Sequence, residues 1–402
     1  MRRFLVLIFC FMLVFSFSVG AVEKTVSSEC DISDIEVPLS ESTETAAVGT
    51  ALEIKAKSAV LLEPNTGKIL YEQNADEQLP PASITKIMSL LLVMEALDRG
   101  DFGLETVVSA SEHACSMGGS QIWLEPGEGM TVHELLKATV IASANDACVA
   151  LGELVAGSEE GFVELMNRRA KELGMNSTTF KNCTGLDAEG HITTANDVAI
   201  MSGELIKHDL IKDYSTVWMD TLRDGKSELV NTNKLVRFYK GTTGLKTGTT
   251  SIAKYCLSAT AERDGLSLVA VIMAGETSTD RFEGAKKLLD FGFANFSFQE
   301  IGADLADTEI PLLKGEKKTL KVEAEEQLSL LAEKTAKSDI KRETVWNKNI
   351  TAPIKKGQTV GYVNIYNGDE NIGKIPIKAT ENIMKRNFPL SFGKILKGLF
   401  KI

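Results

Sequence analysis

The chain has 402 residues, of which 44% are hydrophobic and 25% are charged, a composition typical of an ordinary globular protein. This length allows a substantial core and more than one domain. The formal net charge of −11 argues against a general nucleic-acid-binding protein. We find no glycine-rich phosphate loop and no Cys-x-x-Cys pair, and the spacing of the four histidines predicts neither a metal site nor a bound cofactor.

The N-terminus has the pattern of an export signal. Arg2 and Arg3 precede a continuous apolar stretch from Phe4, and Val19-Gly20-Ala21 offers small residues for cleavage. The alternative is an uncleaved membrane anchor, but the apolar run is shorter than the roughly 20 residues that a spanning helix needs. We therefore predict a signal peptide over residues 1–21 and an exported protein. Residues 22–50, rich in Ser, Thr, Glu and Ala, are predicted to form a flexible linker.

Five cysteines would remain after cleavage, and an odd number in an exported protein implies a free thiol or an intermolecular bond. Their spacing does not resemble a compact disulfide framework, so the disulfide state stays open. Two of them lie in apolar surroundings, which favours the interpretation that they are small buried hydrophobic residues. The five are Cys30, Cys115, Cys148, Cys183 and Cys256, and the two in apolar surroundings are Cys148 and Cys256.

The next segments predict a hairpin followed by a central helix. Apolar residues 59–62 and 68–71 flank a turn cluster at 63–67, which predicts two paired strands. Pro80 and Pro81 then interrupt the chain. The apolar run from Ile84 to Leu97 is too long for one strand and is rich in Leu, Met and Ala, so it predicts a helix buried on every side.

Ser83 and Lys86 would lie three residues apart on one face of the first turn of this helix. A serine becomes a strong nucleophile only when a base takes its proton, and a lysine acts as a base only when its amine is neutral. Burial and the positive end of the helix dipole both disfavour the ammonium form. Free N–H groups at the helix start could also stabilise an oxyanion. Ser83 as nucleophile and Lys86 as base is therefore a coherent hypothesis.

The Ser-x-x-Lys spacing alone is a weak pattern, because average composition gives about one or two chance matches in a chain of this length. Three others occur, at Ser251–Lys254, Ser338–Lys341 and Ser391–Lys394. Two later motifs distinguish the first match. Ser143-Ala144-Asn145 and then Lys246-Thr247-Gly248 follow it in the order that is typical of penicillin-binding proteins and serine β-lactamases.

The segments between these motifs predict an α+β domain over residues 51–296. The pattern is mostly helical between Gly100 and His208, and strand character returns in residues 230–237 and 241–248. Residues 255–260 and 266–273 predict a second hairpin around Asp264-Gly265, and residues 285–293 predict a helix. Strands at both ends with helices between them indicate an antiparallel sheet that carries an inserted helical lobe.

The last hundred residues differ in composition. Alternating apolar residues predict a small all-β domain over residues 297–380. Residues 381–402 predict a basic amphipathic helix that is too short to span a bilayer but suited to lie on the outer surface of the cytoplasmic membrane. The alternative is a helix packed on its own domain.

With these motifs in order, the sequence resembles serine-type D-alanyl-D-alanine carboxypeptidases, which are low-molecular-mass penicillin-binding proteins. The resemblance runs from residues 59–63 through the three motifs to residues 288–293, and the export signal, β-rich domain and tail extend it over nearly the whole mature chain. Residues 231–239 resemble the branch found in sporulating bacteria. The resemblance implies a penicillin-binding protein and serine β-lactamase-like catalytic domain followed by the all-β domain, and it implies an extracytoplasmic enzyme on the membrane.

The resemblance also implies hydrolysis of the terminal D-Ala-D-Ala bond of peptidoglycan stem pentapeptides, with β-lactam antibiotics as inhibitors. It assigns attack to Ser83 and proton transfer to Lys86, Ser143 and Asn145. The resemblance also implies that the substrate is held by Lys246, Thr247, Gly248 and Thr249 of the third motif and by Arg281 further along the chain.

Within this set, Lys246 would offer a fixed positive charge to the terminal carboxylate, assisted by the Thr247 hydroxyl. The backbone N–H groups of Ser83 and Thr249 would form the oxyanion hole. Gly248 would allow the substrate backbone to approach closely. Arg281 is either a second carboxylate ligand or a salt-bridged arginine on the surface.

Other interpretations remain open from the sequence. His191 resembles a histidine in a family loop, where stabilising the loop fits better than proton transfer. A class A β-lactamase would use a loop glutamate for deacylation, but Glu164 lies in a predicted amphipathic helix. A third possibility is a non-catalytic cell-wall-binding protein that uses the C-terminal domain. The balance of carboxypeptidase and endopeptidase activity is also open.

Overall fold

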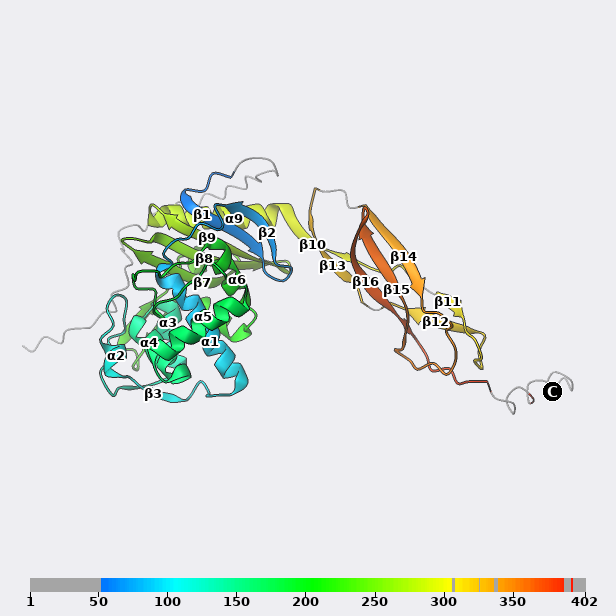
Figure 1. The fold of residues 1–402 in the computed structure, drawn as a ribbon, viewed down its shortest axis with the longest axis horizontal. Coiled ribbons are helices and arrows are strands. Elements are labelled where there is room, and N and C mark those ends of the chain that lie inside the picture. The colour runs from blue at the N-terminus through cyan, green and yellow to red at the C-terminus, as the bar shows by residue number, and fades with distance from the viewer. Residues whose placement is uncertain (1–51, 306–307, 325, 336–338, 387–391, 393–402) are drawn as a thin grey trace, which may run out of the picture.

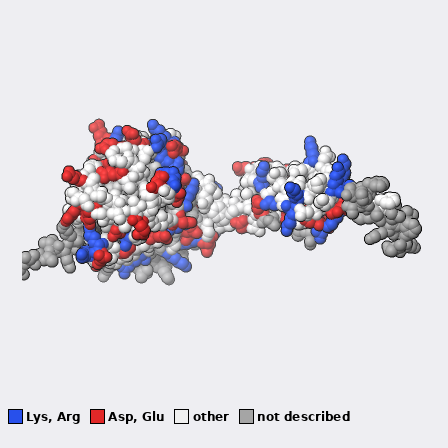
Figure 2. Space-filling view, turned by 90° about the horizontal axis from the view of Figure 1, so that it is seen from below, with Lys and Arg blue, Asp and Glu red and all other residues white. Residues whose placement is uncertain are grey.

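The computed structural model describes residues 52–305, 308–324, 326–335, 339–386 and 392. The predicted signal peptide and linker lie outside these residues. The chain forms a larger N-terminal domain and a smaller C-terminal domain of strands (Figure 1). A narrower connection joins the two in the space-filling view (Figure 2).

A five-stranded antiparallel sheet forms the centre of the N-terminal domain, with the strand order β2-β1-β9-β8-β7. Both predicted hairpins are confirmed. The strands are β1 (Ala56–Glu63), β2 (Lys68–Gln73), β7 (Thr242–Thr250), β8 (Lys254–Arg263) and β9 (Leu266–Gly275). The strand that carries the Lys-Thr-Gly motif, β7, is therefore at one edge of the sheet.

Both faces of this sheet are buried, because successive strand residues point to opposite sides. Ala59 and Leu61 of β1 pack in the cluster that contains helix α9 (Ser278–Asn295), whereas Val60 and Leu62 pack in the cluster that contains helix α1 (Lys86–Arg99). Two layers of helices therefore enclose the sheet (Figure 1). This arrangement confirms the α+β prediction.

The helical lobe lies on the α1 side of the sheet. Its larger helices are α3 (Val132–Ile141), α4 (Asn145–Ala156), α5 (Glu159–Glu172) and α6 (Ala195–Leu205). Its short elements are β3 (Val107–Ser109), α2 (Glu112–Cys115), β4 (Gly129–Thr131), the 3-10 helix η3 (Asp209–Ile211), α7 (Lys212–Ser215), β5 (Met219–Leu222) and β6 (Ser227–Val230). The short helix α8 (Leu235–Phe238) follows, and its Leu235 packs in the cluster that contains α9.

The prediction of one strand over residues 230–237 is wrong. Strand β6 ends at Val230, and a turn then leads into the short helix α8. The two asparagines of this turn explain the break, since their side chains bond to the backbone in place of a strand partner. Asn231 Nδ2 donates to Val217 O at 2.8 Å, and Asn233 Oδ1 accepts from the N–H of Leu235 at 3.1 Å.

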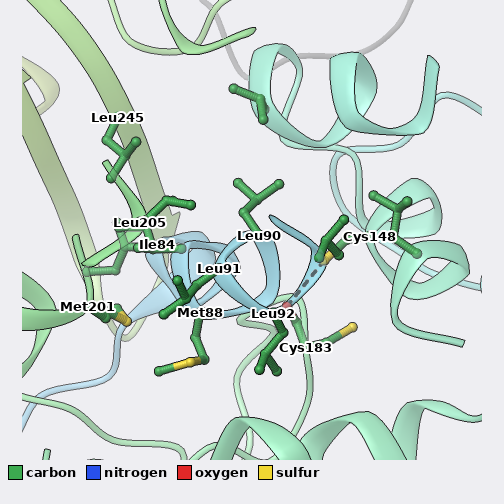
Figure 3. Packing of buried hydrophobic residues seen from close by; sticks show 14 of the residues in the cluster. Ile84, Met88, Leu90, Leu91, Leu92, Cys148, Cys183, Met201, Leu205 and Leu245 are labelled. Carbon is green, nitrogen blue, oxygen red and sulfur yellow. Dashed lines mark hydrogen bonds between the residues drawn. The ribbon is translucent and has the colours of Figure 1, made fainter. Parts of the chain in front are cut away.

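Helix α1 is buried on all sides, as its sequence predicted. Figure 3 shows Leu90 on one side of the helix axis and Met88 and Leu92 on the opposite side, each among other apolar side chains. The helix ends at Gly100, whose φ of 74° gives a left-handed cap. One detail differs from the prediction: Ser83 lies in a 3-10 helix, η2 (Ala82–Thr85), and α1 begins at Lys86.

The C-terminal domain is all β, which confirms the second part of the predicted fold class. Strand β10 (Phe296–Ile301) follows α9 directly and pairs with β13 (Leu328–Glu333). A five-stranded sheet with its own apolar core forms the remainder. Its order is β11 (Glu309–Pro311), β12 (Thr319–Glu323), β16 (Glu370–Ala379), β15 (Thr359–Asn367) and β14 (Ile340–Trp346).

The first residues of the predicted membrane helix belong to this β domain instead. Ile383 is fully buried, and its backbone exchanges hydrogen bonds of 2.9 and 3.0 Å with Ile354. The apolar side chain of Ile383 is needed in the domain core, so residues 381–386 do not start a helix. The rest of the predicted helix lies outside the described residues except Phe392, which is exposed. Among the helices of the described segments, none is long and apolar enough to cross a membrane.

Candidate active site

Ser83 and Lys86 meet at the junction of η2 and α1. Lys86 is fully buried, and its Nζ lies 3.1 Å from Ser83 Oγ, while Ser83 itself is partly exposed. Ala82, just before Ser83, has a φ of 48°, which is uncommon for a residue with a side chain. This local backbone directs the serine toward the lysine, and strained residues of this kind are often found at functional sites.

Three oxygen atoms surround the amine of Lys86. Besides Ser83 Oγ, its Nζ contacts Asn145 Oδ1 at 2.6 Å and the carbonyl oxygen of Thr184 at 2.8 Å. Burial lowers the pKa of Lys86 to about 8, although the nearby Cys148, Cys183 and Asp146 act in the opposite direction. A lysine with this pKa can be neutral near physiological pH, which a proton acceptor requires.

The Ser-x-Asn motif lies where α3 ends and α4 begins. Ser143 is buried and has a φ of 62°, and Asn145 is the first residue of α4. Asn145 bridges two parts of the site, because its Oδ1 accepts from Lys86 and its Nδ2 donates to Gly118 O at 2.6 Å. Within the described part of the chain, no hydrogen bond joins the Ser143 hydroxyl to Ser83 or Lys86.

Strand β7 brings the Lys-Thr-Gly motif against the same junction. Lys246 is fully buried, and its Nζ donates to Thr247 O at 3.2 Å. Burial holds the pKa of Lys246 well below its usual value, and the charges of Lys86 and Arg281 act in the same direction. Burial thus disfavours the charged form of this amine, and its role in binding the substrate carboxylate stays a prediction.

Gly248 is required by the protein's own backbone. A Cβ atom at this position would lie 2.9 Å from the backbone nitrogens of Ser83 and Ile84, and 3.0 Å from Pro81 O. The absence of a side chain lets β7 pack directly on η2, which holds Ser83 beside the edge of the sheet. The sequence had suggested close approach by a substrate, and the contact that the structure gives is this internal one.

Arg281 on α9 lies behind β7 and is buried, so the interpretation as a surface arginine is wrong. Its Nη1 donates to Thr249 Oγ1 at 2.8 Å and to Gly248 O at 3.2 Å. The guanidinium also lies over the rings of Tyr255 and Phe282. Arg281 thus fixes the end of β7 where the N–H of Thr249 lies.

His191 joins the loop of residues 182–191 to the start of α1. Its Nε2 lies 2.9 Å from Thr85 Oγ1, and its Nδ1 accepts from the N–H of Lys181 at 3.4 Å. Burial lowers its pKa to about 4, so the ring is neutral at physiological pH. These contacts fit the loop-stabilising role that the sequence suggested.

Loop residues that no sequence motif had indicated complete the site. Thr184 supplies the third oxygen on Lys86, and Asn182 Oδ1 shapes the loop by accepting from the N–H groups of Thr184 and Gly185. Thr232, in the turn after β6, lies with its hydroxyl 2.7 Å from Thr247 Oγ1. In the sequence, only the many Asn, Thr and Gly residues of these turns point to such loops. A contact made by a backbone carbonyl does not depend on the residue type, so no motif predicts it.

Ser251–Lys254 gives an internal comparison for the Ser-x-x-Lys spacing. Ser251 is exposed in the turn between β7 and β8, and the half-exposed Lys254 lies 3.9 Å from a carboxylate oxygen of Glu276. The same spacing therefore occurs at a surface turn, without the enclosure that lowers the pKa of Lys86. Burial distinguishes the first motif from this one.

Four cysteines are described, and all are free thiols: Cys115, Cys148, Cys183 and Cys256. Cys148 and Cys256 are buried, which confirms their interpretation as small core residues. Cys148 Sγ contacts Cys183 O at 3.4 Å, beside α1 (Figure 3).

A buried lysine in contact with a serine, an asparagine from a second element and a Lys-Thr strand beside them are the parts of a serine acyl-transfer enzyme. A family model described as D-alanyl-D-alanine carboxypeptidase matches residues 42–277, and one described as penicillin-binding protein 5, C-terminal domain, matches residues 293–385. The chain belongs to the family of D-alanyl-D-alanine carboxypeptidases.

Two of the similar proteins below match this chain across most of its length, and the third matches a shorter part. D-alanyl-D-alanine carboxypeptidase DacF of Bacillus subtilis is 45% identical over 339 residues, covering 83% of this chain and 87% of that protein. Penicillin-binding protein 5 from Haemophilus influenzae has a TM-score of 0.67 at 30% identity and covers 84% of this chain and 99% of its own. Penicillin-binding protein D2 from Listeria monocytogenes, solved with ampicillin bound, has a TM-score of 0.55 at 32% identity, covering 60% and 99%.

Proposed function

We propose that this chain hydrolyses the terminal D-Ala-D-Ala bond of peptidoglycan stem pentapeptides and releases D-alanine through an acyl-enzyme on Ser83. Family membership supports the reaction class. The observation that carries the assignment of residues is the 3.1 Å contact between Ser83 Oγ and the buried Lys86 Nζ. A carboxypeptidase of this type needs no cofactor, because nucleophile, base and oxyanion donors all come from the chain.

In the acylation step, Ser83 Oγ attacks the carbonyl carbon of the penultimate D-alanine and its proton passes to Lys86 Nζ. The C–N bond to the last D-alanine then breaks, and the departing amine takes up a proton from Lys86 by way of Ser143. Asn145 orients the amine of Lys86 through its 2.6 Å contact and is placed to hold the peptide. The strongly lowered pKa of Lys86 supports its role as base.

The substrate carboxylate would be bound by Lys246 and the hydroxyl of Thr247. A carboxylate beside a buried lysine restores the charged amine and forms a charge-assisted hydrogen bond, which is stronger than a neutral one. The N–H groups of Ser83 and Thr249 would stabilise the oxyanion. Packing at Gly248 and the contact of Arg281 with Thr249 keep these two N–H groups on adjacent elements. Direct contact between Arg281 and the substrate carboxylate stays a prediction.

Water completes the reaction by attacking the ester carbon of the acyl-enzyme, which releases the shortened peptide and returns the proton to Ser83. A β-lactam would acylate the same serine and would leave more slowly, because its ring-opened product stays in the site. A class A β-lactamase mechanism is not favoured, since Glu164 is exposed on the outer side of α5.

The central experiment follows D-alanine release from a soluble pentapeptide. We expect activity in the wild type and none in Ser83→Ala, with full activity in Ser251→Ala, whose serine has the same Ser-x-x-Lys spacing at the surface. Intact mass after penicillin treatment should show one adduct, and peptide mapping should place it on Ser83. Rapid multiple turnover of nitrocefin, or D-alanine release by Ser83→Ala, would contradict the proposal.

We further propose that the protein is exported and held on the outer surface of the cytoplasmic membrane. The proposed division is a signal peptide over 1–21, a linker over 22–50, a catalytic domain over 51–296, a β domain over 297–386 and an attachment segment over 387–402. The basic and apolar residues of the last segment support this division. Removal of residues 387–402 should move the protein from the membrane fraction to the soluble fraction. Assignment to a sporulation branch remains a prediction.

A further inference from the structure

Three loops meet at the end of the C-terminal domain that lies away from the catalytic domain (Figure 1). They are residues 312–318 between β11 and β12, residues 351–358 before β15, and residues 380–386 after β16. Backbone hydrogen bonds join them: Ala352 N donates to Leu313 O at 2.9 Å, and Arg386 N donates to Lys314 O at 2.8 Å. We call these three loops the distal tip. Because these hydrogen bonds connect all three loops, the distal tip is one ordered surface.

The distal tip is strongly basic in a chain whose net charge is −11. Seven basic residues stand against two acidic ones, Glu316 and Glu381. Lys317 is paired with Glu381, and Glu316 lies beside the backbone N–H of Met384. Blue side chains are prominent at this end of the domain in Figure 2, next to the grey chain end. All seven are exposed: Lys314, Lys317, Lys318, Lys355, Lys356, Lys385 and Arg386.

Two large apolar side chains are exposed among these charges. Leu313 is 53% exposed and Met384 is 64% exposed, and each lies next in sequence to an exposed lysine. The loops that carry them are directly bonded, since Glu316 N donates to Met384 O at 3.0 Å. A surface that combines lysines with exposed apolar side chains suits the boundary between lipid headgroups and acyl chains.

We propose that the distal tip binds the anionic phospholipid surface of a membrane directly. This inference goes beyond attachment through residues 387–402, because the contact is made by the folded domain. The position of the tip supports it: the described domain ends at Arg386, in the tip itself, and the segment that follows carries Lys394, Lys397 and Lys401. A soluble polyanion would use the same lysines but would give Leu313 and Met384 no role.

Direct binding at the tip gives the attachment two parts with different chemistry. Each lysine near an anionic surface adds to binding, and the contribution falls when salt screens the charge. Leu313 and Met384 would enter the interface and make part of the binding insensitive to salt. The tip would also set which end of the β domain faces the membrane, and thus direct the catalytic domain away from it.

The test measures co-sedimentation of the full chain with vesicles of phosphatidylcholine, with or without phosphatidylglycerol. The test variant replaces four tip lysines by glutamine: Lys314→Gln, Lys318→Gln, Lys355→Gln and Lys356→Gln. A matched control makes the same change at four exposed lysines of the catalytic domain: Lys57→Gln, Lys171→Gln, Lys207→Gln and Lys226→Gln. Because both variants lose four positive charges, a general charge effect would weaken both equally.

We expect at least about tenfold weaker binding to anionic vesicles for the tip variant and little change for the control. Amide hydrogen exchange in residues 313–318 and 383–386 should slow when anionic vesicles are added to the wild type. D-alanine release in solution should be unchanged in both variants, which checks the fold.

Equal binding by the two variants, or unchanged exchange at the tip amides, would overturn the proposal. So would equal binding of the wild type to vesicles with and without phosphatidylglycerol. A tip variant that loses binding to a soluble polyanion such as heparin but binds vesicles like the wild type would assign the surface to a polymer in place of lipid. The outcome for residues 387–402 is separate, because both variants keep that segment.

Discussion

The lowered pKa of Lys86 predicts how the acylation rate of Ser83 changes with pH. A shift from 10.5 to about 8 corresponds to about 3 kcal/mol, which burial of the amine supplies. If the neutral amine is the base, the rate follows its fraction, which is about 1% at pH 6 and about half at pH 8. The acylation rate should therefore rise about 50-fold between these values and level off near pH 9.

The assay is single-turnover acylation by a fluorescent penicillin between pH 6 and 10, with circular dichroism to verify that the fold persists. Lys86→Arg provides the test variant, because a guanidinium keeps its proton throughout this range. It should acylate very slowly, without the rise in rate. Lys171→Arg makes the same change at an exposed lysine of α5 and should keep the wild-type profile.

A wild-type rate that stays flat from pH 6 to 9 would refute this reasoning. A midpoint near 10.5 would do the same, since it would mean that burial does not shift the amine. Acylation by Lys86→Arg with a normal pH profile would assign the base to another residue.

Three further predictions concern the packing around the site. Gly248→Ala should lower the free energy of unfolding by about 1–3 kcal/mol and slow acylation, because the new Cβ would lie 2.9 Å from backbone atoms. Gly103→Ala adds a Cβ in open space and should change neither quantity. Equal urea midpoints for the two variants would contradict this prediction. Leu91→Ala in the fully buried face of α1 should cost about 2–5 kcal/mol by urea denaturation, and a loss near zero would mean that the helix is not core. Acidification from pH 6.5 to 4 should lower the free energy of unfolding, because His191 takes up a proton in the unfolded chain while the folded chain holds the ring neutral. His191→Gln should remove about 3 kcal/mol of this pH dependence. An unchanged dependence of the unfolding free energy on pH in this variant would contradict the prediction.

Sequence patterns predicted the parts of the fold whose signal is local. The apolar run of α1, the two hairpins and the alternating residues of the β domain each carry their own periodicity, and each was found where it was predicted. Ser83, Lys86 and Asn145 were predicted from motif order, and the structure brings their side chains together.

Other features depend on contacts that a sequence does not display. The break after β6 arises because Asn231 and Asn233 bond to the backbone of neighbouring elements, which competes with strand pairing. The third oxygen on Lys86 is the backbone carbonyl of Thr184, so its residue type gives no indication. The burial of Ile383 becomes evident only when residues 350–354 fold against it.

Burial of the amines of Lys86 and Lys246 lowers the stability of the folded chain at the proposed catalytic centre. Neither lysine has a carboxylate within ion-pair distance in the described segments, so the unfolded chain accepts protons at these positions more readily than the native one. A bound carboxylate would offset the free-energy cost of burying these amines. The ligand-bound protein should therefore melt at a higher temperature than the free protein. Selection for greater heat resistance alone would favour apolar replacements at these two positions, at the expense of turnover.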